Sequence, residues 1–244
     1  MPIHRLIVCV ALFAALTLDA APKVTAPPAK VRKTLKLDAF YQKHVDVGGL
    51  SIVSSKKVSN YALLEAAFLI RKMLGEGEDI LQAMAKNKVR FAIMAHNEYT
   101  TDIPEHRNLQ PRLYWNKRAR GLGATPERPA VSCGEENLLL YPKDPYSTEN
   151  ILIHEFAHAI HSMGLSETDP TFDDRLEAIY DAAVKQKLWK GKYAGRNHHE
   201  YWAEGVQSWF DTNRENDFDH NHVNTRAELR KYDPVVREHV AYKE

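Results

Sequence analysis

Apolar residues recur at two different spacings along this chain, and the spacings predict its elements. A helical spacing predicts helices over residues 60–74 and 79–87, the first of which is ended by the sequence Gly-Glu-Gly. The runs VRFAIMA (89–95) and ENLLLY (136–141) have the length and apolar character of strands. Helices and strands therefore both occur before the middle of the chain.

The most apolar stretch after residue 100, ILIHEFAHAIH, predicts a central helix over residues 149–163. Ser147 or Thr148 is the expected N-cap of this helix, because each offers a side-chain oxygen to the first free backbone N–H groups. Gly164 is the expected stop.

The rest of the chain reads as helical. Two more helices are predicted over residues 172–189 and 198–212. The expected fold class is therefore α+β: a small mixed sheet packs on the central helix, and the C-terminal half is helical.

The first twenty residues have the three-part layout of a secretory signal peptide. A basic start (MPIHR) precedes an apolar run of 13 residues (LIVCVALFAALTL) and the small residues DAAP. We expect residues 1–20 to be a signal peptide cleaved after Ala20, with an N-terminal membrane anchor as the alternative. The predicted location is secreted, or periplasmic in a bacterium, with no stable membrane association after cleavage.

Residues 21–36 mix Ala, Pro and Lys without apolar periodicity, which is typical of an extended, flexible leader. The folded domain is predicted to span residues 37–244. Removal of the signal peptide takes Cys9 with it and leaves Cys133 as the single cysteine. We therefore expect no internal disulfide, and Cys133 is interpreted as a buried thiol.

Charge excludes some classes of partner. The chain has 33 Lys and Arg residues against 32 Asp and Glu residues, so no overall field favours nucleic acid or an anionic membrane. The basic run at residues 116–120 is interpreted as a solvated loop, because it is too short to bind nucleic acid. The four tryptophans are expected to lie in the core rather than to bind carbohydrate.

The central helix carries the sequence His154-Glu155-Phe156-Ala157-His158, an HExxH pattern. Residues four apart lie about one helical turn from each other, so His154 and His158 share a face. Two imidazoles in this arrangement can reach one Zn²⁺. Glu155, about 100° round the helix, can act on the water without binding the metal. The alternative is a pair of hydrogen-bonded core histidines.

A catalytic zinc needs a third protein ligand and one open position. His161 lies on nearly the same face as His158, but three ligands along one helix would span about 10 Å, which is too far for one ion. His161 is therefore expected to be a neighbouring, non-ligating group. The extended HExxHxxGxxH pattern also fails, because Gly164 stands where its third histidine is required.

The better candidates lie downstream, in the sequence YAGRNHHEYWAEGVQSWF. Glu200 and Glu204 are four residues apart and share one face of the predicted helix over 198–212. One glutamate from this second helix would complete a His-His-Glu site. The other can accept a hydrogen bond from the outer N–H of a ligating histidine and so fix its tautomer.

The HExxH pattern followed some forty residues later by Tyr-x6-Glu-x3-Glu resembles the catalytic domain of the anthrax lethal factor family of zinc metallopeptidases, which includes secreted Pro-Pro endopeptidases. The match covers residues 149–163 and 193–210. Ala157 stands where the family often has Gly, and the chain has no room for the toxin's receptor-binding and delivery domains. The resemblance therefore implies a zincin-like catalytic domain of gluzincin type over residues 37–244, but not a translocated toxin.

The resemblance also assigns roles residue by residue. It implies one Zn²⁺ per chain, a catalytic base and an active-site tyrosine that donates to the developing oxyanion. The matching positions are His154, His158 and Glu200 for the metal ligands, Glu155 for the base, Tyr193 for the tyrosine and Glu204 for the second glutamate of the motif.

The expected function is a secreted zinc endopeptidase that hydrolyses peptide bonds of a protein or peptide substrate. The alternatives are a catalytically inactive zinc-binding interaction module and a zinc hydrolase of a non-peptide acyl bond. Glu155 argues against the inactive module, because a binding module needs no general base at this place. An edge strand is expected to bind extended substrate, and either residues 89–95 or residues 121–125 could supply it.

Two further groups of polar residues are left open. The stretch DHNHVNTR (219–226) could hold a second metal, or it could be a hydrogen-bonded loop. His198 and His199 directly precede Glu200 and are interpreted as residues at the rim of the site rather than ligands.

Overall fold

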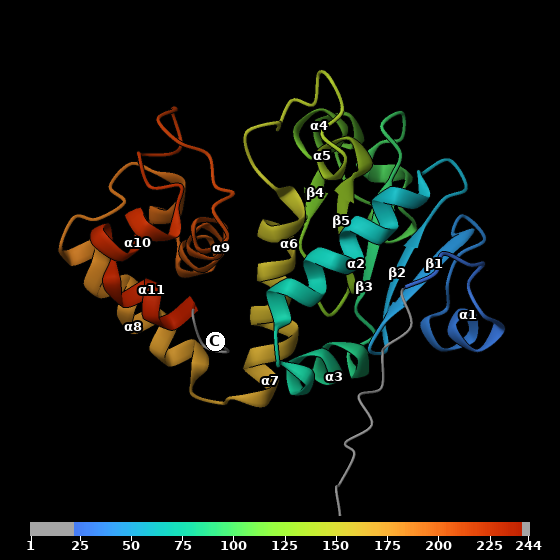
Figure 1. Cartoon of the computed structure of the whole chain (residues 1–244), viewed down its shortest axis with the longest axis horizontal. Helices are drawn as coiled ribbons and strands as arrows, with labels where there is room; N and C mark the ends of the chain where they lie inside the picture. The colour runs from blue at the N-terminus through green and yellow to red at the C-terminus, as the bar shows by residue number, and fades with distance from the viewer. Residues whose placement is uncertain (1–21, 241–244) are drawn as a thin grey trace, which may run out of the picture.

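Five short strands form one mixed sheet in the computed structural model, which describes residues 22–240 (Figure 1). The strand order is β1-β2-β3-β5-β4. Strands β2, β3 and β5 run parallel, whereas β1 and β4 are antiparallel edge strands. Their bounds are β1 (Lys43–Val47), β2 (Leu50–Ser54), β3 (Arg90–Met94), β4 (Gly121–Leu122) and β5 (Ala130–Gly134).

Helices surround this sheet and make up the whole C-terminal half, so the α+β class is confirmed (Figure 1). The α-helices are α1 (Ala29–Leu35), α2 (Asn60–Leu74), α3 (Glu78–Lys86), α4 (Arg112–Arg118), α5 (Glu135–Leu138), α6 (Ile151–Ile160), α7 (Ser166–Thr168), α8 (Phe172–Lys185), α9 (His198–Trp209), α10 (Arg226–Tyr232) and α11 (Pro234–Val240). A π-helical turn, η3 (His161–Leu165), and three short 3-10 turns, η1 (Thr100–Asp102), η2 (Pro104–His106) and η4 (Tyr193–Gly195), complete them.

Side chains alternate between the two faces of the sheet, as strand geometry requires. In β3, Phe91 and Ile93 join the main core beneath α2 and α6, whereas Ala92 and Met94 join a smaller apolar cluster on the opposite face. Both faces of β3 are therefore covered. This explains why its sequence is a continuous apolar run rather than an alternating one.

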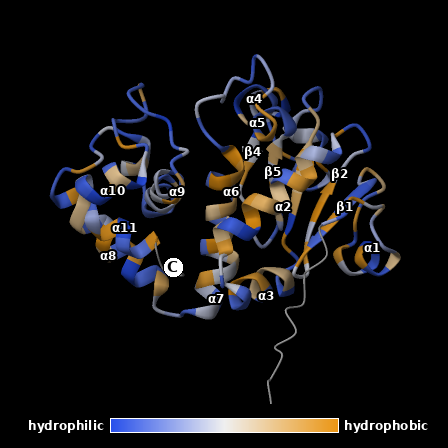
Figure 2. Cartoon of the chain, in the orientation of Figure 1, coloured by the Kyte–Doolittle hydropathy of each residue, from blue (hydrophilic) through white to orange (hydrophobic). Residues whose placement is uncertain are grey.

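The main core continues from the sheet through α6 into the C-terminal helices. Phe156 of α6 is fully buried and lies edge-on to Phe91 of β3, with ring centroids 6.2 Å apart. Trp202 of α9 is also fully buried in this core. Figure 2 shows the apolar character concentrated on α6, α2 and the strands, where they pack together. Helix α6 thus lies between the two halves of the molecule.

Several predicted elements are confirmed. The helix expected over residues 60–74 is α2, and those over 79–87 and 172–189 are α3 and the somewhat shorter α8. The strand expected over 89–95 is β3. The helix expected over 198–212 is α9, which ends three residues earlier.

The strand predicted over residues 136–141 is wrong, because that segment begins as the short helix α5. Its buried polar side chains make tertiary hydrogen bonds instead of a strand ladder. The Glu135 carboxylate accepts from the backbone N–H groups of Ser59, at 2.7 Å, and His96, at 3.1 Å. Asn137 accepts from the backbone N–H of Ile151 at 2.8 Å. These long-range contacts outweigh the local preference of the apolar run for a strand.

The central helix differs from the prediction at both ends. Its N-cap is Asn150, whose side chain accepts from the Ile153 N–H at 3.2 Å, rather than Ser147 or Thr148. Gly164 does not end the helix, which continues through the π-helical turn to Leu165. A Cβ at Gly164 would lie 2.6 Å from a methyl group of Ile80, so the glycine instead permits the close approach of α3.

The extended leader predicted over residues 21–36 is wrong for its described part. Residues 29–35 form α1, and Thr25 pairs with His44 of β1. The predicted signal peptide, residues 1–20, lies outside the described residues. Within residues 22–240, no helix combines the length and apolar character needed to cross a membrane.

Candidate metal centre

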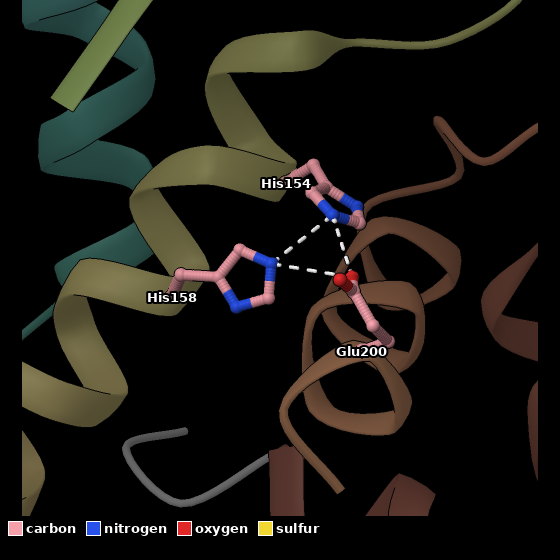
Figure 3. A group of neighbouring side chains, drawn as sticks. All are labelled: His154, His158 and Glu200. Atoms are coloured by element: carbon pink, nitrogen blue, oxygen red, sulfur yellow. Dashed lines mark hydrogen bonds and ion pairs between the residues drawn. The ribbon is translucent and has the colours of Figure 1, made fainter. Parts of the chain in front are cut away.

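Two helices from the two halves of the molecule bring three candidate ligands together (Figure 3). His154 and His158 project from successive turns of α6, and Glu200 faces them from the first turn of α9. The two Nε2 atoms are 3.2 Å apart. Glu200 Oε2 lies 3.2 Å from Nε2 of His154 and 3.3 Å from Nε2 of His158. Among the described residues, these three form the one group of His, Cys, Asp and Glu side chains close enough to share a metal ion.

Helix α9 holds Glu200 at this place through its cap and its packing. The Asn197 side chain caps the helix by accepting from the Glu200 N–H at 2.9 Å. Two residues later, the buried Trp202 donates from its indole N–H to the carbonyl of Ala157 at 2.8 Å. This bond joins α9 directly to the turn of α6 between the two histidines.

The triangle of ligand atoms has the size that zinc requires. A tetrahedral zinc bound at 2.0–2.1 Å places its ligand atoms roughly 3.3 Å apart. The three observed separations, 3.2, 3.2 and 3.3 Å, match this spacing. Glu200 Oε2 is buried and, despite its two close nitrogens, has no hydrogen-bond partner. A cation at the centre would satisfy this oxygen, so the residues fit a metal.

A glutamine decides which nitrogen of His154 faces the triangle. Gln207 Nε2 donates to the Asn150 carbonyl at 3.2 Å and lies 3.4 Å from a carboxylate oxygen of Glu149, which orients the amide. Gln207 Oε1 therefore faces His154 Nδ1 at 2.8 Å and can only accept. The neutral His154 thus carries its proton on Nδ1 and directs the Nε2 lone pair at the metal position.

Charge around His154 also favours a cation. Burial alone lowers the pKa of His154, but the close Glu200 carboxylate and the charges of Glu155 and Glu204 raise it to about 10. For Glu200, burial raises the pKa, but the two close histidines lower it below its usual value. The site thus holds a positive charge strongly, either as a proton or as a metal that displaces it.

Glu204 does not make the hydrogen bond predicted for it. Its nearest oxygen is 3.5 Å from His154 Nδ1, whereas Gln207 is at hydrogen-bond distance. Glu204 instead accepts from Asn213 Nδ2 at 3.0 Å and lies 3.5 Å from His220 Nε2. Its buried charge contributes to the field around His154 and links the site to the loop over residues 213–223.

Glu155 lies between α6 and the edge strand β4. A Cβ at Gly121 would lie 3.0 Å from Glu155 Cγ, and one at Gly123 would lie 3.6 Å from Glu155 Oε2. Burial raises the pKa of Glu155, although the charges of His154 and His158 oppose the effect. A raised pKa makes the carboxylate a better proton acceptor, which suits a general base.

Tyr193 approaches the triangle from the turn η4. Its hydroxyl lies 3.3 Å from Glu200 Oε1, and the guanidinium of Arg196 stacks 4.1 Å from the centre of its ring. Burial, followed by the charges of Glu200 and Glu155, raises the pKa of Tyr193 well above its usual value. The hydroxyl therefore stays protonated and available as a donor at neutral pH.

The remaining histidines do not join the triangle. His161 donates from Nε2 to the Asp173 carboxylate at 2.5 Å, and its Nδ1 lies 3.4 Å from Nδ1 of His199, which borders the cleft. The second metal considered for residues 219–226 has no ligand group among the described residues. In that loop, His220 Nδ1 bonds to Asp217 at 2.9 Å, as expected for a hydrogen-bonded loop.

A cleft of about 620 Å³ opens over the triangle. One wall is β4 and the end of α4, and the other carries Tyr193, His199 and the loop with Asp219 and His220. Strand β4 is the edge of the sheet beside the cleft, whereas β3 lies in the middle of the sheet. Of the two predicted substrate strands, 121–125 is therefore the available one and 89–95 is not.

The sequence analysis missed Gln207 and misread both Trp115 and the run 116–120. Gln207 was missed, although it lies three residues after Glu204 and seven after Glu200, on the same face of α9. Trp115 borders the cleft instead of lying in the core, where Trp189, Trp202 and Trp209 do lie. The run 116–120 is not a solvated loop: it ends α4, and Arg120 pairs with Glu136 at 2.5 Å.

Comparisons with known proteins identify no relative of this chain. No protein family model matches the sequence, and no curated protein is similar to it. The resemblance to the lethal factor family thus rests on the motif residues alone.

Proposed function

We propose that this chain is a zinc-dependent endopeptidase of gluzincin type with a zincin-like fold, secreted after removal of its signal peptide. The observation that carries the proposal is the His154, His158 and Glu200 triangle, whose spacing suits tetrahedral zinc, with Glu155 beside it in an open cleft. A closed structural zinc site would use four protein ligands. The triangle has three, and the remaining position faces the cleft.

Bound zinc would supply a Lewis acid that polarises the scissile carbonyl and lowers the pKa of water to about 7. Glu155 then accepts a proton from the attacking water and passes it to the leaving amine. Burial raises the pKa of this carboxyl, which brings its basicity closer to that required at neutral pH. Such acid–base help is typically worth about 10²–10⁴-fold in rate.

Tyr193 has the complementary role in this proposal. Its hydroxyl is protonated, partly buried and already 3.3 Å from Glu200 Oε1, the carboxylate oxygen that does not face the two histidines. A small rotation would direct it at an oxygen atom on the substrate carbon under attack. Donation to the negative charge that develops there would stabilise the transition state.

The cleft also supports an extended peptide as the substrate. Strand β4 pairs with β5 on one side only, so its other edge is free to bind a further strand through backbone hydrogen bonds. Gly121 and Gly123 lie against Glu155 and His158, so a peptide on this edge would run past the catalytic residues. This arrangement favours peptides over small acyl esters.

The test compares wild-type protein with Glu155→Gln, loaded with zinc, on a diverse peptide library and on simple esters. We expect one zinc in each protein, and peptide cleavage that falls by about 10²–10⁴-fold in the variant, because only the proton acceptor is lost. Glu177→Gln, on the exposed face of α8, is the matched control and should cut like wild type.

Three outcomes would contradict the proposal. Zinc binding without cleavage by either protein would favour the inactive zinc-binding module. Cleavage of esters but not of peptides would favour a hydrolase of non-peptide acyl bonds. Absence of bound zinc from both proteins would reject the metal centre itself.

A further inference from the structure

One of the three arginines that border the cleft makes no salt bridge within residues 22–240. Arginines 118, 120 and 214 all border the cleft. Arg120 pairs with Glu136 at 2.5 Å, and Arg214 pairs with Asp217 at 2.6 Å. Arg118 has no salt bridge within residues 22–240. Of the three arginines, only Arg118 therefore has a charge that no carboxylate of the described residues neutralises.

Arg118 is nevertheless held in place. Its guanidinium lies over the ring of Trp115, 5.9 Å from the centroid, one turn earlier in α4. Its backbone carbonyl accepts from the Tyr146 hydroxyl at 2.5 Å. The next residue, Ala119, is buried, and its carbonyl accepts from Thr100. An anchored backbone and an aromatic support reduce the freedom that an exposed arginine loses when it binds an anion.

Arg118 shares its cleft with the proposed reaction centre. It borders the same cleft as Glu155 and Tyr193. Its side chain is exposed there, so a substrate group in the cleft can reach it. The planar guanidinium presents a fork of N–H donors that matches a carboxylate in two parallel hydrogen bonds.

The direction of β4 indicates which part of a peptide would meet Arg118. Arg118 precedes Gly121 by three residues, so it lies beyond the start of β4, whereas Gly123 lies beside His158 at its end. A peptide added antiparallel to β4 runs from the Gly123 end toward the Gly121 end. Its residues after the cleaved bond therefore lie nearest Arg118.

We propose that Arg118, supported by Trp115, binds a substrate carboxylate on the C-terminal side of the cleaved bond. This inference rests on the proposed endopeptidase function and names its substrate class. The carboxylate is either an Asp or Glu side chain close after the cleaved bond or the C-terminus of a short peptide. Both sources offer the same planar pair of oxygens.

A binding experiment tests the carboxylate site without catalysis. Zinc-loaded Glu155→Gln is immobilised and exposed to a synthetic random octapeptide library, and the same is done with Glu155→Gln/Arg118→Gln. We expect peptides with Asp or Glu to be enriched roughly three- to tenfold on the first protein and to lose that enrichment on the second. A library with amidated C-termini separates the sources: a fall in the total peptide retained by the first protein after amidation identifies the terminal carboxylate.

A cleavage experiment tests the side of the bond. The ratio of kcat/KM for paired peptides with Glu or Lys after the cleaved bond is measured for wild type and Arg118→Glu. We expect wild type to favour Glu and Arg118→Glu to favour Lys. Lys117→Glu is the matched control, because it makes the same charge change on the neighbouring exposed residue, and it should keep the wild-type preference.

Equal enrichment together with equal total retention by the two immobilised proteins would overturn the inference. Where peptides with Asp or Glu are enriched, an unchanged Glu/Lys ratio in Arg118→Glu would also overturn it. If Lys117→Glu changes the Glu/Lys preference as much as Arg118→Glu does, the inference is also overturned. The preference would then depend on the overall charge of this part of the surface and not on Arg118 itself. If wild type enriches acidic peptides through Arg118 but cuts none, the proposed endopeptidase function fails while the carboxylate site stands.

Discussion

At the scale of single residues, the proposed metal centre depends on groups outside the His154, His158 and Glu200 triangle. Gln207 holds the proton of His154 on Nδ1, because its own amide is oriented by Glu149 and Asn150. Without that partner, the proton of His154 could sit on Nε2, and Nε2 would then have no lone pair to bind the metal. Such supporting hydrogen bonds commonly contribute a substantial part of metal affinity.

We therefore expect Gln207→Leu to weaken zinc binding by about 10–100-fold while leaving the three ligands present. Competition with a chromogenic chelator measures the change. Gln82→Leu, which removes an exposed amide far from the site, is the control for loss of a glutamine. Zinc affinity equal to that of wild type would show that Gln207 does not set the tautomer.

His106 makes the stability of the fold depend on pH. Burial lowers the pKa of His106 from 6.5 to about 4, and its Nε2 lies 3.1 Å from the Ser132 hydroxyl. Below pH 6.5 the unfolded chain binds a proton at His106 that the folded protein does not. Its contribution to stability is therefore complete above about pH 6.5 and is lost progressively down to about pH 4.

When the pH falls from 7.5 to 5, proton binding at His106 in the unfolded chain should lower the free energy of unfolding by about 2 kcal/mol. His106→Gln should flatten that part of the pH dependence, because glutamine does not titrate. Urea unfolding at both pH values measures the difference, with His222→Gln as a control that removes an exposed histidine. A wild-type slope in His106→Gln would exclude the buried imidazole as its source.

At the scale of elements, the contact between β4 and α6 places the edge strand beside Glu155, the proposed general base. Gly121 and Gly123 make this contact possible, since neither has a side chain to separate strand and helix. A Cβ at Gly121 would lie only 2.3 Å from Ile151 Cγ2 and 2.9 Å from the Ser132 carbonyl. At Gly123 the nearest atom, His158 Cβ, would be 3.1 Å away.

We expect Gly121→Ala to destabilise the fold by about 1–3 kcal/mol, because strand and helix must move apart to admit the methyl group. Peptide cleavage should fall as well, since β4 would shift away from Glu155. Gly123→Ala should lower stability and peptide cleavage less, because a methyl group at this position has more space. Thermal unfolding and kcat/KM would be measured for each. Equal effects of the two substitutions would contradict the strand–helix contact as the cause.

At the scale of the whole molecule, the proposed metal centre spans the two halves of the fold. His154 and His158 belong to α6, which packs on the sheet, and Glu200 belongs to α9 in the helical half. A bound ion would therefore link elements that are some forty residues apart in sequence. It would also neutralise charges that are costly to bury together.

Removal of the metal should consequently lower thermal stability. With free zinc at about a thousand times its dissociation constant, the stabilisation is about 4 kcal/mol, or roughly 10 °C in Tm for a chain of this size. Calorimetry with zinc and with a chelator measures the shift. His158→Ala should show little further loss on chelation, and an unchanged wild-type Tm would reject a zinc site.

The sequence predicted which three side chains would come together, because those on each helix are related by local geometry. HExxH places two histidines one turn apart on any helix, and the Glu200–Glu204 spacing does the same on the next helix. The long periodic helices α2 and α9 were recognised for the same reason. The strand predicted over 136–141 failed because Glu135 and Asn137 find their partners far along the chain.

What the sequence determined by itself, then, is the face that each helix presents and the chemistry carried on it. Only the tertiary structure decided that Gln207 rather than Glu204 bonds to His154, that β4 is the edge strand, and that Arg118 faces the cleft without a carboxylate partner. The reason is physical. Backbone geometry sets the spacing of side chains within a helix, whereas hydrogen-bond partners and burial depend on segments that meet only after folding.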